Sequence, residues 1–132
     1  MLYLDSSAIV KLVTRERGTT ELVQAIRTDP EVVSSALART EVVRAVRRSG
    51  GRTARAETVL ERIALVHIDD GILRSASHLA PTGLRTLDAI HLATALSLAS
   101  DLAALVTYDV RLEAAATEAG LEVRSPGQEP AR

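Results

Sequence analysis

The opening residues Leu2-Tyr3-Leu4-Asp5-Ser6-Ser7-Ala8 decide the fold of this chain. A short apolar run ends in a carboxylate, and the residues after it follow a helical apolar pattern. This order predicts a buried strand over residues 1–4 and a helix over residues 6–14. Asp5 then lies at the carboxyl end of the strand, the edge at which open α/β sheets bind ligands and metals. Asp5 is equally suited to cap the helix, so its role depends on residues elsewhere in the chain.

The rest of the chain repeats this alternation of short apolar runs and amphipathic segments. Further strands are expected over residues 31–35, 65–68, 104–107 and 121–123. Further helices are expected over residues 19–28, 36–48, 52–64, 70–79, 86–99 and 109–119. Alternating strands and helices predict a single α/β domain, with a central parallel sheet of four to five short strands flanked by helices on both faces. This domain is expected to span residues 1–124, followed by a flexible tail over residues 125–132.

The composition of the chain excludes several classes of function. Its 132 residues include no cysteine, which excludes disulfides, thiolate zinc sites and cysteine catalysis. Hydrophobic residues make up 46%, yet Phe and Trp are absent, so the core must be aliphatic. The net charge of −1 produces no global field that would attract nucleic acid or an anionic membrane. Because no signal-peptide pattern and no apolar run of about 18 residues occurs, a cytoplasmic protein without membrane contact is expected.

Four carboxylates occupy positions where a merely solvated acid is not expected. Asp5 and Asp109 both follow predicted strands, and Glu41 lies at the edge of an apolar helix face. Asp88 lies near the start of a helix that is apolar almost all round. This last acid is the most informative, because burying a carboxylate is unfavourable unless a partner compensates for it.

Each of these acids also has a simple structural explanation. Arg85 precedes Asp88 by three residues and can pair with it on the helix surface. Arginines one turn further on can pair with Glu41 in the same way, and Asp109 can cap the last helix. His91 is expected to be a hydrogen-bonded residue of the core. Taken singly, Asp5, Glu41 and Asp109 could therefore have either a structural role or a role in a metal site.

Taken together, the four acids predict a divalent-metal site. Oxygen ligands without cysteine or paired histidines favour Mg²⁺ or Mn²⁺ over zinc. Converging carboxylates raise one another's pKa, so such a cluster needs a cation to stay ionised. At such sites, divalent ions activate water and stabilise the transition state of phosphodiester hydrolysis. Ser6 and Thr107 lie beside the acids and are expected to orient them or their bound waters.

Four segments together carry a resemblance to a known family. They are Leu2-Tyr3-Leu4-Asp5-Ser6-Ser7-Ala8, Glu41-Val42-Val43-Arg44, Leu87-Asp88-Ala89-Ile90-His91-Leu92-Ala93-Thr94-Ala95 and Val106-Thr107-Tyr108-Asp109. In this order they resemble the PIN domain and, more narrowly, the VapC-type toxins of bacterial toxin–antitoxin pairs. The similarity runs over nearly the whole chain, and the combination is far more specific than any one segment.

The resemblance implies a Mg²⁺- or Mn²⁺-dependent endoribonuclease with Asp5, Glu41, Asp88 and Asp109 as catalytic acids. Asp5 and Asp88 are expected as the main metal ligands, with Glu41 and Asp109 as further ones. The resemblance also implies a homodimer or a larger toxin–antitoxin assembly, a VapB-like antitoxin partner and a structured RNA substrate. Glu113, one helical turn beyond Asp109, is expected to face solvent.

Residues 39–62 hold seven arginines against three glutamates, a local surplus in a balanced chain. Candidates for contact with RNA phosphates are Arg44, Arg47, Arg48 and Arg52. Alternatively, these arginines belong to two solvated helices. Two other functions also fit the sequence: a PIN-like module that binds RNA or protein without cutting, and an RNA-processing nuclease outside any toxin–antitoxin system.

Overall fold

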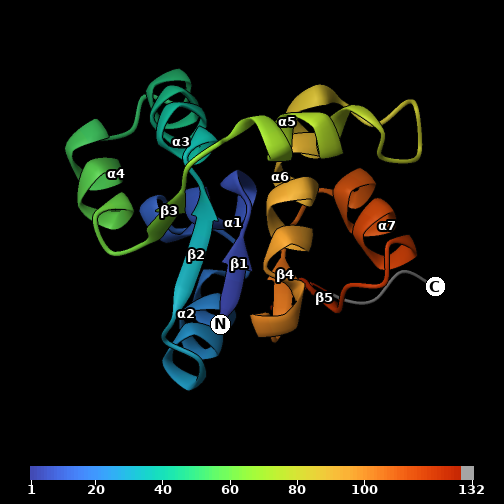
Figure 1. Ribbon diagram of the computed structural model, residues 1–132. Helices are drawn as coiled ribbons and strands as arrows, with labels where there is room; N and C mark the ends of the chain where they lie inside the picture. Colours follow the sequence, from blue (N-terminus) through green and yellow to red (C-terminus); the bar gives the residue numbers. More distant parts are fainter. Residues whose placement is uncertain (129–132) are drawn as a thin grey trace.

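The computed structural model describes residues 1–128, in which five strands alternate with helices (Figure 1). The strands are β1 (Leu2–Leu4), β2 (Val32–Ser35), β3 (Ala64–Val66), β4 (Ala104–Val106) and β5 (Val123–Arg124). The helices are α1 (Ser6–Val13), α2 (Thr19–Thr28), α3 (Leu37–Arg48), α4 (Thr53–Leu60), α5 (Asp70–Ser77), α6 (Thr86–Ser97), η1 (Ala99–Asp101) and α7 (Val110–Glu118).

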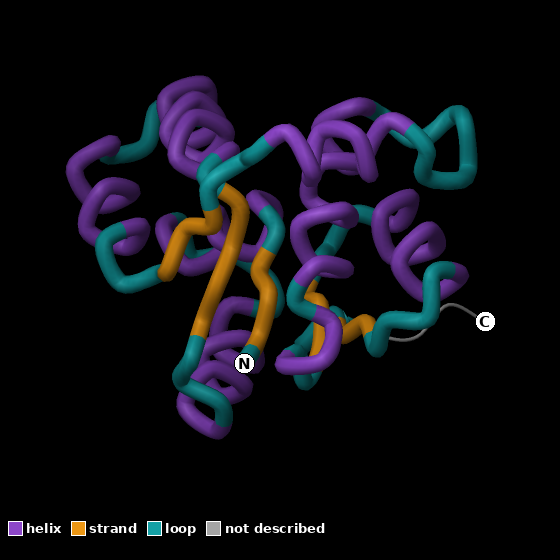
Figure 2. The backbone as a smooth tube through the Cα atoms, in the orientation of Figure 1, coloured by secondary structure: helices purple, strands orange, loops and turns teal. Residues whose placement is uncertain are grey.

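All strand pairs of the sheet are parallel, and the strand order is β3-β2-β1-β4-β5. The helices lie on both sides of the sheet (Figure 2), which confirms the predicted α/β architecture. β1 and β4 are neighbours, with Leu4 paired with Val106, so both strands end at the same edge. The chain therefore brings the residues that follow β1 close to those that follow β4, about a hundred positions later.

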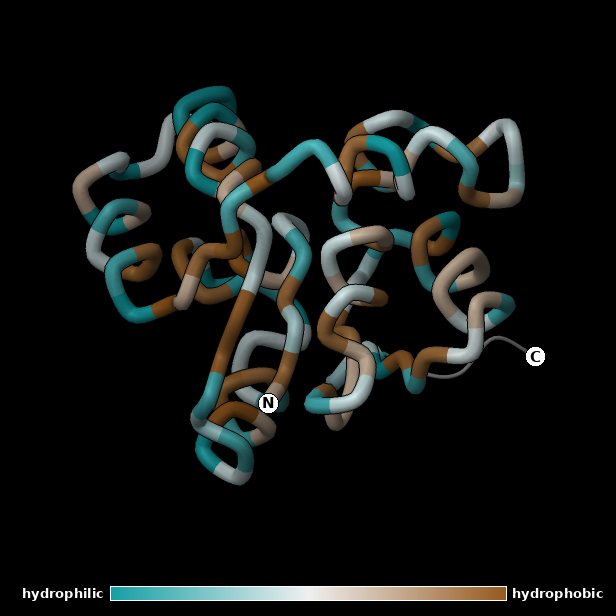
Figure 3. The backbone as a smooth tube through the Cα atoms, in the orientation of Figure 1, coloured by the Kyte–Doolittle hydropathy of each residue, from teal (hydrophilic) through white to brown (hydrophobic). Residues whose placement is uncertain are grey.

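Side chains of the strands alternate between two aliphatic cores, as the period of a strand requires. Leu2, Leu4 and Val106 pack with helices α1 to α4 on one face of the sheet. Tyr3 and Leu105 pack with α6 and α7 on the other face. Figure 3 shows hydrophobic residues along β1 and β2, whereas the outer end of α3 is hydrophilic. β1 and β4 are covered on both faces, so their side chains are either apolar or polar groups that are buried and hydrogen-bonded.

The segment between α4 and β3 differs from the expected boundaries. The helix expected over residues 52–64 ends at Leu60, and the strand expected over 65–68 begins at Ala64. Pairing of β3 with β2 aligns Val33 with Ala64, so residues 61–63 must form the turn. Tertiary strand pairing here overrides the helical pattern of the sequence.

Two further expectations concern the C-terminal tail and the absence of a membrane-spanning helix. Within the predicted tail, the Ser125 hydroxyl donates to the Thr107 carbonyl at 2.7 Å, and the Pro126 carbonyl accepts from Tyr108 at 2.8 Å. Residues 129–132 of that tail lie outside the described residues. Across residues 1–128, none of the helices has the length and apolar character needed to cross a bilayer.

Candidate active site

Asp5 lies at the junction of β1 and α1, against the end of β4. Its Oδ1 accepts hydrogen bonds from the Ser7 hydroxyl at 2.6 Å and from the Ala8 amide at 3.0 Å. The hydroxyl of Thr107, at the end of β4, donates to Oδ2 at 2.5 Å. Asp5 therefore caps α1 and is also held between two strand ends. Burial raises the pKa of the Asp5 carboxyl, although these donors and the charge of His91 act in the opposite direction.

Glu41 projects from α3 and is only partly buried. Its Oε1 accepts from the Ser6 hydroxyl at 2.5 Å and lies 2.7 Å from His91 Nε2. Burial alone would raise the pKa of the Glu41 carboxyl, but the hydrogen bond and charge of His91, with Ser6 and Arg85, outweigh it and lower that pKa. Glu41 is thus held in its ionised form, ready to act as an oxygen ligand.

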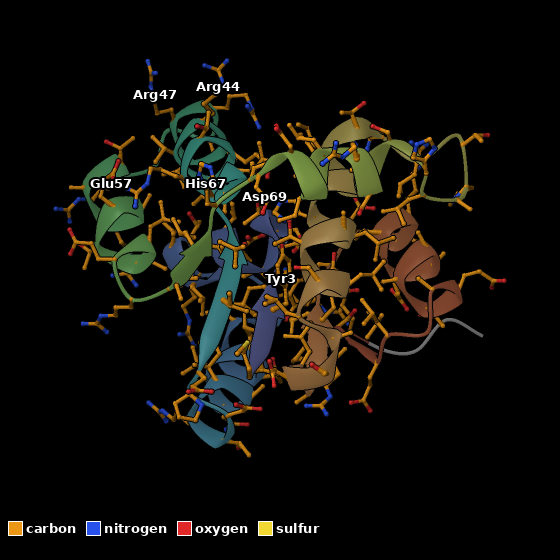
Figure 4. The ribbon with its side chains drawn as sticks, in the orientation of Figure 1. Tyr3, Arg44, Arg47, Glu57, His67 and Asp69 are labelled. Carbon is orange, nitrogen blue, oxygen red and sulfur yellow. The ribbon has the colours of Figure 1, made fainter. Side chains whose placement is uncertain are left out.

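His91 in α6 connects Glu41 to the centre of the sheet. Its ring is 2% exposed, and its Nδ1 lies 2.7 Å from the hydroxyl of Tyr3 in β1. Figure 4 shows Tyr3 pointing from β1 toward α6. Burial raises the pKa of the Tyr3 hydroxyl far above its usual value, so this group stays protonated. The sequence predicted a hydrogen-bonded core histidine, and the contact with Glu41 adds a link from the core to the acids.

Asp88 and Asp109 share one cation, the guanidinium of Arg85. Arg85 Nε donates to Asp88 Oδ2 at 2.9 Å, and its Nη2 donates to Asp109 Oδ2 at 2.5 Å. Asp109 also caps α7, because its Oδ1 accepts from the Arg111 and Leu112 amides. The ion pair with Arg85, which was the simpler alternative for Asp88, is therefore present, and Arg85 also pairs with Asp109, a second acid of the predicted quartet.

Side-chain contacts thus hold the four acids in three groups. Asp5 is bound by hydroxyls, Glu41 by His91, and the other two acids by Arg85. The charge of Arg85 lowers the pKa of Glu41, so these groups share one electrostatic neighbourhood. Among residues 1–128, no three aspartate, glutamate or histidine side chains are already arranged around one metal position.

The donor set nevertheless fits a hard divalent cation. Its ligating atoms are carboxylate oxygens without any sulfur, which is the chemistry of Mg²⁺ and Mn²⁺ sites. The Arg85 guanidinium stands in for a cation between Asp88 and Asp109. The Arg85 side chain is 57% exposed, so most of its surface is already in contact with solvent.

The candidate RNA-binding arginines lie in the second half of α3 and just before α4. Arg44, Arg47 and Arg48 border a shallow depression of about 280 Å³ at the end of α3. Arg44 and Arg47 extend outward from α3 (Figure 4). Arg52, which precedes α4, is exposed but does not border this depression.

Glu113 in α7, which was expected to face solvent, is only partly buried.

Two contributors to the site were not identified from the sequence. Ser7 donates to Asp5 and also accepts the Tyr108 amide at 3.0 Å, which joins the start of α1 to the end of β4. Tyr3 supports His91 from within β1. A hydroxyl in an otherwise aliphatic strand is a visible signal for Tyr3, whereas Ser7 carries no signal beyond its fitness to cap a helix.

Comparison with known proteins gives concordant matches. The family model described as "PIN domain" matches residues 2–118. Ribonuclease VapC46 of Mycobacterium tuberculosis is 48% identical over 126 residues, covering 95% of this chain and 97% of that protein. The fold is similar to that of the M. tuberculosis Sarcin-Ricin loop cleaving toxin VapC20, with a TM-score of 0.73, 14% identity and coverage of 96% and 100% of the two chains. It is also similar to a chain of a toxin–antitoxin complex from Klebsiella pneumoniae, with a TM-score of 0.68, 23% identity and coverage of 84% and 88%.

Proposed function

The chain belongs to the PIN domain family, and we propose that it is a Mg²⁺- or Mn²⁺-dependent endoribonuclease, the toxin of a toxin–antitoxin pair in the cytoplasm. The contacts of the four acids support the proposal. The Thr107 hydroxyl holds Asp5 beside the end of β4, and Arg85 pairs with both Asp88 and Asp109. Glu41 accepts a hydrogen bond from Ser6, the residue that follows Asp5. The extensive identity to a protein named as a ribonuclease supports the choice of RNA as substrate.

In this proposal, Asp5 and Asp88 hold the divalent ion, and Glu41 and Asp109 complete its surroundings. The ion would lower the pKa of a bound water and offset charge that develops on the scissile phosphate. Thr107 and Ser7 keep the Asp5 carboxylate fixed through hydrogen bonds of 2.5 and 2.6 Å. Ser6 restrains Glu41 in the same manner, so the ligands are orientated before RNA arrives.

Metal removal tests this function. The purified chain is incubated with total RNA in EDTA, in Mg²⁺ and in Mn²⁺, and new RNA 5′ ends are mapped by sequencing. Cleavage at a few sites is expected with either metal and none in EDTA, because the phosphodiester bond lacks an activated water without the ion. RNA that the protein retards in a native gel, but that gains no new 5′ ends in any buffer, would contradict nuclease activity. That result would favour a module that binds RNA without cutting it.

Arg85 is expected to compete with the divalent ion. Replacing it in Arg85→Gln removes the cation that now pairs with Asp88 and Asp109. We therefore expect Mn²⁺, measured by electron paramagnetic resonance of the free ion, to bind several-fold more tightly to the variant. Arg74→Gln on α5 is the control, since it removes the same charge from an exposed residue outside the site. Equal or weaker Mn²⁺ binding by Arg85→Gln would contradict the competition.

The antitoxin is proposed to bind a groove of about 450 Å³ between α2 and α4. Apolar side chains form its floor, including Leu12, Val23 and Val59, and three arginines border it: Arg27, Arg55 and Arg62. An antitoxin segment with apolar and acidic side chains would match this lining. Arg55 is already fixed by its hydrogen bond to the Val13 carbonyl at 2.7 Å, so part of the surface is preorganised.

A homodimer and a larger toxin–antitoxin assembly also belong to this proposal. The exposed apolar side chains of Leu87 and Val110, beside Asp88 and Asp109, supply surface for a protein contact. The toxin role has a separate check in the product of the adjoining gene, which is expected to suppress cleavage when co-purified. Cleavage that this product leaves unchanged would favour an RNA-processing nuclease outside a toxin–antitoxin pair.

A further inference from the structure

We propose that His91 is a positioning residue, which together with Tyr3 holds Glu41 by one carboxylate oxygen and leaves the other oxygen facing the metal site. This inference rests on the proposed metal-dependent function and assigns a role in it to two buried residues. Neither residue would touch the ion or the RNA.

The histidine is held from both sides by side chains of other elements. Its Nδ1 lies 2.7 Å from the Tyr3 hydroxyl, and its Nε2 lies 2.7 Å from Glu41 Oε1. The two rings meet nearly edge to face, at an interplanar angle of 81°. The chain of contacts therefore runs from β1 through α6 to α3 and links three elements in one line.

The proton positions follow from the partners of each nitrogen. An ionised Glu41 only accepts, so His91 Nε2 must carry a proton and donate it. The Tyr3 hydroxyl donates to Nδ1 when the ring is neutral and accepts from Nδ1 when the ring is charged, so it partners this nitrogen in both states. With both nitrogens engaged in this way, the ring can neither flip nor exchange its tautomer without losing a buried hydrogen bond.

The bonds to Glu41 converge on a single atom. Ser6 and His91 both donate to Oε1, at 2.5 and 2.7 Å. Among the described residues, no hydrogen bond reaches Oε2. Oε1 is thus anchored, and Oε2 remains available to bind a metal ion. A metal-ligating carboxylate is commonly held in this way, by a hydrogen bond to one of its oxygens.

A purely structural reading explains less of this geometry. A buried histidine that serves only the core can satisfy its nitrogens with nearby backbone carbonyls or hydroxyls. Here one nitrogen instead reaches a partly exposed carboxylate fifty residues away in sequence, in the acidic group. Because these hydrogen bonds already fix the rotamer of Glu41, the side chain loses less conformational entropy when it binds an ion, and binding is stronger.

Three variants test the role: His91→Leu, His91→Gln and Tyr3→Phe. Leucine removes the donor to Glu41, whereas the glutamine amide can restore it without the Tyr3 contact. Phenylalanine keeps the aromatic ring in β1 but leaves Nδ1 without its hydrogen-bond partner. Mn²⁺ affinity of the RNA-free protein is measured by electron paramagnetic resonance, cleavage is measured as kcat and KM, and thermal melting reports the fold.

Mn²⁺ affinity is expected to fall about 10- to 100-fold in His91→Leu, the usual cost of losing an outer partner of a ligand. Glutamine should recover most of that loss, and Tyr3→Phe should lie between wild type and leucine. The cleavage defect is expected in kcat at fixed Mn²⁺ and to diminish as Mn²⁺ is raised, with KM for RNA unchanged.

Several outcomes would overturn the role. One is unchanged Mn²⁺ affinity in a folded His91→Leu or in Tyr3→Phe. Another is a His91→Gln variant that melts at the wild-type temperature but binds Mn²⁺ as weakly as His91→Leu does. If His91→Leu does not fold, the other two variants decide alone. Failure of the wild-type chain to bind Mn²⁺ would instead overturn the metal-dependent function itself, and the positioning role with it.

Discussion

Asp5→Asn and Asp88→Asn are each expected to reduce RNA cleavage by more than about 100-fold. Loss of an outer partner of a metal ligand costs roughly 10- to 100-fold, and loss of the ligand's own charge should exceed that range. Cleavage rates are compared with the same RNA and Mg²⁺ concentration for the variants and the wild type. The control is Asp101→Asn, which removes the same charge from an exposed acid in η1.

The fold of Asp5→Asn is expected to survive this change. The asparagine oxygen can still accept from the Ala8 amide and the Ser7 hydroxyl, so α1 keeps its cap. Burial disfavours the charge at this position, as the raised pKa of Asp5 indicates, so the neutral amide relieves a cost. Its nitrogen also replaces the oxygen that accepts from the Thr107 hydroxyl, so one hydrogen bond is lost and the melting temperature should stay close to that of the wild type. A cleavage loss without a loss of stability would separate function from folding. Unchanged cleavage in both Asp variants would contradict the proposed ligands.

Arg44 and Arg47 carry the second large prediction, which concerns RNA affinity. Changing both to glutamine in an Asp88→Asn background should weaken RNA binding strongly at low salt. Each lost phosphate contact is expected to lower the slope of log affinity against log salt by about 0.7 to 0.9, so the double variant should lose roughly 1.5. Fluorescence anisotropy across a salt series measures both quantities.

The matched control for this variant is the pair Arg27→Gln and Arg62→Gln. It removes the same charge from the groove between α2 and α4, which the proposal assigns to the antitoxin. RNA affinity and salt slope should remain close to those of the parent. Equal effects of the two double variants would indicate a diffuse attraction to total charge and would contradict a specific phosphate contact at the end of α3.

Much of the architecture could be predicted because it is encoded locally. The apolar run before Asp5, the apolar surface of the helix around Asp88 and the alternation of elements each occupy a short window of sequence. The structure confirms the parallel sheet with helices on both faces. The boundary of α4 was wrong because strand pairing, a long-range interaction, decides where residues 61–63 turn.

The sequence by itself determined which acids occupy unusual positions, since an acid that follows a buried strand or interrupts an apolar helix is conspicuous wherever the chain later folds. Apart from the local pair of Arg85 with Asp88, the partners of the acids come from distant parts of the chain and depend on the fold. Thr107 meets Asp5 across 102 positions, His91 meets Glu41 across 50, and Arg85 meets Asp109 across 24. Such pairs depend on strand order and on which helix faces which edge, and these follow from packing of the whole sheet. The seven opening residues thus predicted a ligand-binding edge, whereas the fold supplied the hydroxyls, the histidine and the guanidinium that hold its acids.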